Sequence, residues 1–132
     1  MALLVLAGVV NRNTPILQDK DLLGAWLYQL AELIEMHPVS LSTEGYEHWP
    51  AGAPSATLYI EESAITVHCY PETRFMEIVM HSCKAIPDPL GIARKIQAEL
   101  QMDVRFYLYE PALDWRALSL KAHPSAAIVQ EV

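Results

Sequence analysis

The chain has 132 residues, of which 52% are hydrophobic and 19% are charged, and its formal net charge is −7 at pH 7. This length suits one domain with one hydrophobic core, and the large apolar share excludes a disordered chain. The acidic balance argues against nucleic acid as a partner, because a phosphate-binding surface needs an excess of Lys and Arg.

The first segment, Ala2–Val10, is almost entirely apolar. It is too short to span a bilayer and has no basic region before it, so we expect a buried strand and neither a membrane anchor nor a signal peptide. The two cysteines, Cys69 and Cys83, are too few for a disulfide framework and belong to no motif with zinc spacing. We therefore expect a cytoplasmic protein with no metal site and no membrane partner.

Two segments predict helices. Apolar residues recur at helical spacing over Asp19–Met36, and the helix should end at His37 because the proline after it disfavours helical geometry there. A second helix is predicted from about residue 89 to residue 101, with Asp88 as its N-cap.

Strands are predicted where the chain is apolar or alternates: Ala2–Val10, Val39–Tyr46, Ser55–Glu61, Ala64–Tyr70, Phe75–Cys83 and Val104–Tyr109. Residues 111–132 have no clear period, which predicts a loosely held tail. The order of strands and helices predicts an α+β fold, a two-layer sandwich in which an antiparallel sheet carries both helices on one face. We expect residues 1–132 to form a single domain.

The alternation in the central hairpin defines a register. A four-residue turn, 71–74, puts the apolar positions of both flanking strands on one face, beneath the helices. The same register places Ser63 opposite Ser82 and Cys83 beside Glu62.

His68 is predicted on the other face of the sheet, five residues from Ser63. That separation is about 16 Å along an extended strand. The two side chains can therefore cooperate only if a second subunit is present. For His81 we expect a structural role, and for Cys69 a place in the core.

One segment carries a recognisable motif. Residues 61–72 read Glu-Glu-Ser-Ala-Ile-Thr-Val-His-Cys-Tyr-Pro-Glu, and His-Ser-Cys follows at 81–83. This pattern resembles the central motif of the bacterial and archaeal S-adenosylmethionine decarboxylases, Glu-Ser-His-Ile-Ser-Ile-His-Thr-Trp-Pro-Glu followed by a cysteine. The likeness is dense over about residues 49–100 and rests on the serine, histidine, Pro-Glu and cysteine at their spacing.

The resemblance implies a proenzyme that cleaves itself between Glu62 and Ser63, into pieces 1–62 and 63–132. In the family the serine hydroxyl attacks the preceding carbonyl to form an ester, and elimination leaves a covalent pyruvoyl group, which is the cofactor.

The family assists this cleavage with a serine and a histidine from the partner subunit, which match Ser55 and His68. The resemblance therefore implies a homodimer with shared active sites. It also implies the family's fold, a sandwich of the S-adenosylmethionine decarboxylase type.

The resemblance further implies a small-molecule substrate with a primary amine and a carboxylate. In the family the pyruvoyl carbonyl forms a Schiff base with the amine, and a cysteine that matches Cys83 returns a proton after carbon dioxide leaves. An aromatic residue that stacks on adenine matches Trp49, and a glutamate that holds the ribose matches Glu72. Glu62 is also expected to bind substrate. The implied reaction is decarboxylation of S-adenosylmethionine for spermidine biosynthesis.

Two departures from the family pattern keep other functions open. Ala2–Val10 lacks the aromatic and acidic residues that family members carry on their first strand, and Ala64 stands where histidine is usual. A chain of this kind could decarboxylate arginine or ornithine on the same scaffold, or could be an unprocessed, non-catalytic relative. The retention of Ser63, His68 and Cys83 argues against the last alternative.

Overall fold

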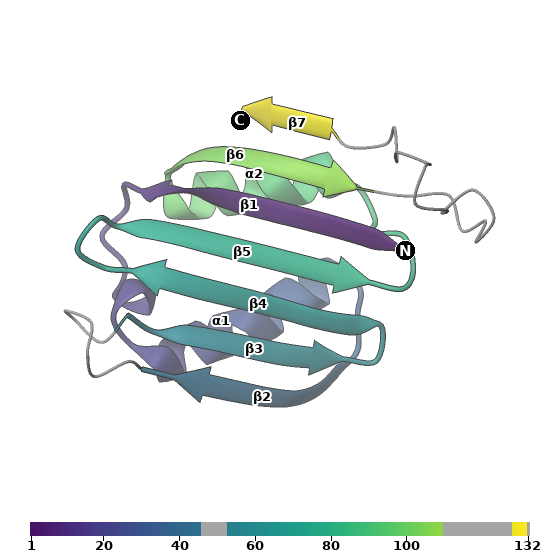
Figure 1. Ribbon diagram of the computed structural model, residues 1–132, viewed down its shortest axis with the longest axis horizontal. Helices are drawn as coiled ribbons and strands as arrows, with labels where there is room; N and C mark the ends of the chain where they lie inside the picture. Colours follow the sequence, from purple (N-terminus) through teal and green to yellow (C-terminus); the bar gives the residue numbers. More distant parts are fainter. Residues whose placement is uncertain (46–52, 110–127, 132) are drawn as a thin grey trace, which may run out of the picture.

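The computed structural model describes residues 1–45, 53–109 and 128–131. In chain order the elements are β1 (Ala2–Val10), the 3₁₀ helix η1 (Pro15–Leu17), α1 (Lys20–Leu33), β2 (Pro38–Glu44), β3 (Ser55–Ile60), β4 (Ser63–Tyr70), β5 (Phe75–Ser82), α2 (Pro89–Leu100), β6 (Met102–Tyr109) and β7 (Ile128–Glu131). The seven strands form one antiparallel sheet in the order β2-β3-β4-β5-β1-β6-β7. Both helices lie on the same face (Figure 1), which confirms the predicted α+β sandwich.

The core fills the space between this face and the helices. On the neighbouring strands β1, β4 and β5, every second side chain points into the core, as the period of two in a strand requires. Leu4, Ile65 and Ile78 are fully buried examples, one from each strand. Helix α1 approaches β2 closely at Gly24, where an added Cβ would lie 2.8 Å from Leu41 Cδ2. The missing side chain therefore sets how near the helix can pack to the sheet.

Both helices begin at side-chain caps. Asp19 accepts hydrogen bonds from the backbone N–H groups of Asp21 and Leu22, and Asp88 accepts one from Gly91. These carboxylates satisfy N–H groups that have no partner inside the helix, and losing such a cap usually costs about 1 kcal/mol. The predicted N-cap at Asp88 is confirmed.

Helix α1 ends at Leu33, three residues before the predicted end at Met36. Glu35 takes a left-handed conformation, with a φ of 58°, and the N–H of Met36 bonds to the carbonyl of Ala31. A residue of this conformation reverses the chain and closes the last helical turn. The helix therefore ends through its own terminal turn before Pro38 can act.

The second face of the sheet is covered by no helix in the described part of the chain (Figure 1). Its outward positions include many apolar side chains: Leu3, Val5, Val9, Tyr59, Tyr70, Val79 and Tyr107. Tyr59 is 51% exposed and Tyr107 49% exposed. Apolar side chains on an uncovered face of a sheet can pack against another surface.

The prediction of a loosely held tail over 111–132 is wrong at its end. Ile128–Glu131 forms β7, which pairs with β6 and extends the sheet by one edge strand. A four-residue strand is too short to show a period, and its paired residues lie 20 to 26 positions earlier in the chain. Residues 110–127 lie outside the described residues.

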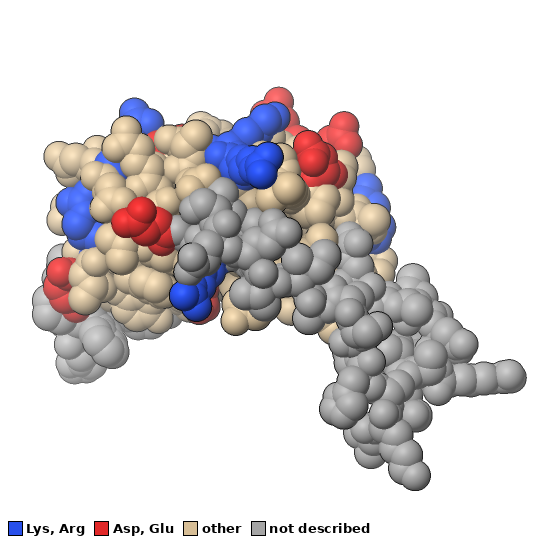
Figure 2. All heavy atoms as spheres, turned by 90° about the horizontal axis from the view of Figure 1, so that it is seen from above, with Lys and Arg blue, Asp and Glu red and all other residues tan. Residues whose placement is uncertain are grey.

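The charged side chains are mixed on the side of the molecule seen in Figure 2. Lys and Arg stand among Asp and Glu there and are not gathered by sign. The chain has 9 basic and 16 acidic residues.

Candidate active site

The junction between Glu62 and Ser63 lies beside Cys83. The β4–β5 ladder pairs Tyr70 with Phe75 and Ser63 with Ser82, which confirms the predicted register. Just beyond the ladder, the backbone N–H of Cys83 donates to the Glu62 carbonyl oxygen at 2.8 Å. This donor polarises the carbonyl that precedes Ser63 and would stabilise negative charge developing on its oxygen.

Ser63 begins β4, and its hydroxyl has a close partner in the same chain. Its Oγ lies 3.1 Å from Nδ1 of His81, on the neighbouring strand β5. The ladder places Ala64 opposite His81, so the imidazole is one residue away from Ser63 along β4. The expected structural role for His81 overlooked this contact, although the predicted register already placed His81 next to the junction.

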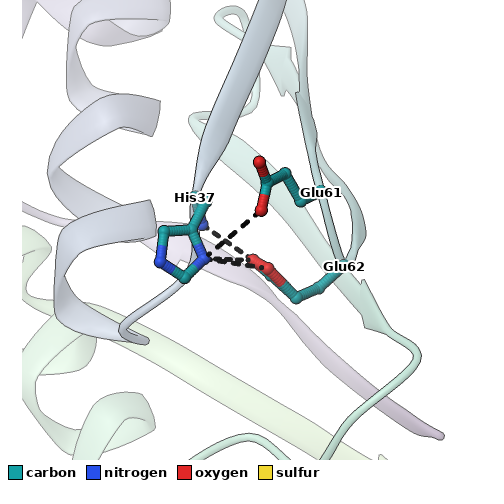
Figure 3. Close-up of side chains that lie close together, drawn as sticks. All are labelled: His37, Glu61 and Glu62. Atoms are coloured by element: carbon teal, nitrogen blue, oxygen red, sulfur yellow. Dashed lines mark hydrogen bonds and ion pairs between the residues drawn. The ribbon is translucent and has the colours of Figure 1, made fainter.

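Glu62 itself is held from the α1–β2 connection. Its carboxylate accepts a hydrogen bond from the His37 backbone N–H at 2.8 Å, and Oε1 lies 3.1 Å from His37 Nδ1 (Figure 3). The backbone hydrogen bond lowers the pKa of Glu62 below its usual value, more than burial of the carboxylate raises it. His37 was predicted only as a helix end. Its contact with Glu62 spans 25 residues of sequence and has no local signal.

Three potential metal ligands meet at this point: His37, Glu61 and Glu62, whose ligand atoms lie within 4.8 Å of one another. His37 Nδ1 is also 3.9 Å from a carboxylate oxygen of Glu61. The side chains of His37 and Glu61 are largely exposed to solvent. Hydrogen bonding and charge account for the arrangement, and we assign it no metal.

The two cysteines differ in environment. Cys83 is exposed at the end of β5, next to the junction. Cys69 is 1% exposed, as predicted for a core residue, and burial raises the pKa of its thiol to about 12. Only Cys83 therefore offers an accessible thiol near Ser63.

Ser55 and His68 come together elsewhere on the sheet. The β3–β4 ladder pairs Ser55 with His68, and the β4–β5 ladder places Glu77 on the other side of His68. Ser55 is 6% exposed. Five residues of β4 separate His68 from Ser63, which corresponds to about 16 Å. One chain therefore brings Ser55 to His68 but leaves both far from Ser63.

Of the two predicted nucleoside contacts, only one is in the described residues. Glu72 is exposed in the turn between β4 and β5, at the end of the hairpin where His68 lies. Trp49 lies outside the described residues.

A pocket of the described structure opens on the helix side of the molecule. Its lining comes from the end of α1, the segment that precedes α2 and the first turns of α2: Glu32, Leu33, Glu35, Pro87, Asp88, Gly91, Ile92 and Lys95. It contains none of the residues predicted to act, so the candidate site is the strand-end junction and not this pocket.

Within the described part of the chain, the helices are all too short or too polar to cross a membrane.

The sheet and its two helices have a counterpart among solved structures. The crystal structure of the adenosylmethionine decarboxylase from Aquifex aeolicus VF5 superposes with a TM-score of 0.67, covering 86% of this chain and 92% of that one. The two sequences are 14% identical, so this likeness concerns the fold. No curated protein sequence matches the chain. The family model for S-adenosylmethionine decarboxylase matches residues 4–107. This chain therefore belongs to the S-adenosylmethionine decarboxylase family, whose members are carboxy-lyases.

Proposed function

We propose that the chain cleaves itself between Glu62 and Ser63 and then decarboxylates S-adenosylmethionine, as a step toward spermidine. The observation that carries the proposal is the pairing of a polarised carbonyl with a nucleophile. Cys83 N–H donates to the Glu62 carbonyl oxygen at 2.8 Å, and the next residue is Ser63, whose hydroxyl has an imidazole partner. Such a pairing is what acyl transfer requires.

Cleavage first exchanges one amide bond for one ester bond. A bond forms between Ser63 Oγ and the Glu62 carbonyl carbon, the carbon–nitrogen bond breaks, and the freed amine of residue 63 takes the hydroxyl proton. Removal of the Cα proton then releases the Glu62 carboxylate from this ester. One water enters and one ammonia leaves, so residues 63–132 begin with a pyruvoyl group and residues 1–62 end with Glu62.

The second step needs a base at the Cα of residue 63, and we assign it to a second copy of the chain. His68 cannot reach Ser63 of its own strand, since about 16 Å separates them. The uncovered sheet face, with exposed Tyr59 and Tyr107, is a surface on which a second copy can pack. In the proposed homodimer, Ser55 and His68 of one subunit act on Ser63 of the other.

The residues around the junction fit a pyruvoyl group at position 63. That group supplies a carbonyl for the substrate amine and takes up electrons when carbon dioxide leaves. Cys83 is exposed beside position 63, and we assign its thiol as the proton donor. Glu62, Trp49 and Glu72 are assigned to substrate binding, and the hydrogen bonds from His37 hold the Glu62 carboxylate.

A cytoplasmic location is part of the same proposal. Cys69 and Cys83 are both free thiols, which suits a reducing compartment.

Arginine or ornithine is the second candidate substrate. The observation that favours it is strand β1, Ala2–Val10, which carries only aliphatic residues and glycine and so provides no aromatic or acidic contact for a nucleoside.

Mass spectrometry of the denatured protein tests the cleavage. We expect two pieces, 1–62 and pyruvoyl-63–132, and a whole chain for Ser63→Ala. Ser42→Ala, an exposed serine in the middle of β2, serves as the matched control and should be cleaved. A wild-type chain that stays intact after long incubation contradicts the proposal and favours the non-catalytic relative.

Carbon dioxide release from S-adenosylmethionine, arginine and ornithine tests the substrate. Trp49→Ala and Glu72→Ala should weaken use of S-adenosylmethionine, since stacking on one base is worth about 1–3 kcal/mol. Glu44→Ala, an exposed glutamate at the end of β2, is the control for Glu72→Ala. Release from arginine or ornithine alone would overturn the nucleoside assignment.

A further inference from the structure

The imidazole beside Ser63 belongs to His81, and none of the steps above assigns it a proton transfer. His81 Nδ1 lies 3.1 Å from Ser63 Oγ, within hydrogen-bond distance of the atom that must attack. The ladder neighbours of His81 are Ala64 on β4 and Leu3 on β1, and neither carries an ionisable group. The ring is exposed, so its Nε2 can hold a proton in contact with water while Nδ1 accepts one.

The attack on the Glu62 carbonyl needs a base within reach of the Ser63 hydroxyl. A serine hydroxyl is a weak nucleophile until a neighbouring group accepts its proton. His68 of the same strand is too far away to do so, at about 16 Å. His81 meets the geometric requirement for a general base, which is hydrogen-bond reach of the proton that it removes.

We propose that His81 is the catalytic base for ester formation, an inference that rests on the proposed self-cleavage. Nδ1 of His81 takes the Ser63 hydroxyl proton as Oγ bonds to the Glu62 carbonyl carbon. The N–H of Cys83 holds the resulting oxyanion. The proton passes from His81 to the nitrogen of residue 63 as the carbon–nitrogen bond breaks, so His81 ends the step neutral and the ester is complete.

This assignment divides the two histidines between two steps. His81 acts within its own chain to form the ester, and the partner subunit's His68 acts afterwards to eliminate it. Ester formation should therefore persist when His68 is absent, whereas it should fail when His81 is absent.

A trap for the ester isolates the first step. In a His68→Ala chain the ester should form and persist, and hydroxylamine should split it into two pieces, with a hydroxamate on Glu62 and a free amine on Ser63. The rate at which these pieces appear at saturating hydroxylamine, read by mass spectrometry, measures ester formation alone.

The key variant carries His81→Ala together with His68→Ala and is compared with the His68→Ala chain. We expect the trapped pieces to appear about 10²–10⁴-fold more slowly, the usual worth of a positioned base. Added imidazole should restore part of the rate, because the site of the lost ring is exposed and open to a small molecule. It should not accelerate the His68→Ala parent, which keeps its own imidazole.

A second substitution separates a base from a structural contact. Asparagine can place a polar atom near the position of Nδ1 but cannot accept the proton, so His81→Asn should be as slow as His81→Ala. An unchanged trapping rate in His81→Ala, or full recovery with asparagine, would overturn the role of His81 while leaving self-cleavage intact. A wild-type chain that neither cleaves nor yields trapped pieces would overturn both proposals.

Discussion

The two ends of strand β4 hold different halves of the candidate chemistry. At its start, Ser63 is within hydrogen-bond distance of His81, and Cys83 N–H donates to the carbonyl just before Ser63. Toward its other end, His68 lies between Ser55 and Glu77 on neighbouring strands. The first region holds a nucleophile and a polarised carbonyl. The second holds an imidazole beside a nearly buried hydroxyl and has no scissile bond.

The separation follows from the geometry of a strand. An extended chain advances about 3.3 Å per residue and cannot fold back on itself, so the two halves cannot meet within one protomer. In the proposed homodimer a two-fold axis would bring the two halves together, because when one subunit's Ser63 meets the other's His68, the reverse pair meets as well. Each sheet would then carry both halves of a site that is completed across the interface.

Mixing two chains that are each inactive alone should restore cleavage, which neither chain completes by itself. Ser63→Ala and His68→Ala chains should each stay whole or arrest at the ester when alone. In a heterodimer, the His68→Ala chain has Ser63 and receives His68 from its partner, so it should be cleaved fully. Intact mass should therefore show pieces from the His68→Ala chain and none from the Ser63→Ala chain.

The control for this mixture is a Ser63→Ala, His68→Ala double variant, combined with the His68→Ala chain. No interface of that pair has both groups, so no pyruvoyl piece should form. If the single-variant mixture gives no more product than this control, the two ends of β4 do not cooperate across subunits.

Substitution of Cys83 tests the role of its thiol at the start of β4. Cys83→Ala keeps the backbone N–H that donates to the Glu62 carbonyl, so cleavage should continue. Turnover should fall by about 10²–10⁴-fold, because the proton donor is lost. The variant should also inactivate during turnover through a misplaced proton. Both effects are measured by carbon dioxide release against the amount of cleaved chain.

The buried thiol provides the matched control. Cys69→Ala removes a core side chain and should reduce the free energy of unfolding without changing turnover per folded chain. Full activity in Cys83→Ala would transfer the acid role to another group, with His81 next to be tried.

A smaller effect is expected for the carboxylate of Glu62. The His37 N–H lowers the pKa of this group below 4.5, so its contribution to stability is complete above that value and is lost as pH falls through the lowered pKa. In a Ser63→Ala chain, Glu62→Gln should make the free energy of unfolding fall less steeply on acidification. Urea unfolding between neutral pH and a pH of about 3 measures this change. Glu61→Gln is the control, since its side chain is largely exposed.

If the unfolding midpoint of the Glu62→Gln chain falls on acidification as steeply as that of the Ser63→Ala parent, the hydrogen bond from His37 to Glu62 does not contribute to stability. The start of β4 would then differ from its other end only through the Glu62 carbonyl and the Ser63 hydroxyl.

Several features of this protein follow from its sequence because their causes are local. A strand has a period of two, so alternation and the four-residue turn at 71–74 together predicted that Ser63 pairs with Ser82 and that Cys83 adjoins Glu62. A helix cap requires only an acceptor near free N–H groups, so Asp88 was predictable. The motif around Ser63 likewise pointed to the family that the later comparison showed.

Only the tertiary structure decided the features that depend on distant segments. Strand β1 lies between β5 and β6, and the four residues of β7 join the far edge, because pairing partners can be chosen across the whole chain. The His37–Glu62 contact joins two loops 25 residues apart. The position of Ser63 Oγ against His81 depends on a side-chain rotamer at the end of a strand, where alternation no longer specifies direction. Side-chain direction and long-range pairing are properties of the packed molecule, and periodicity carries no information about either.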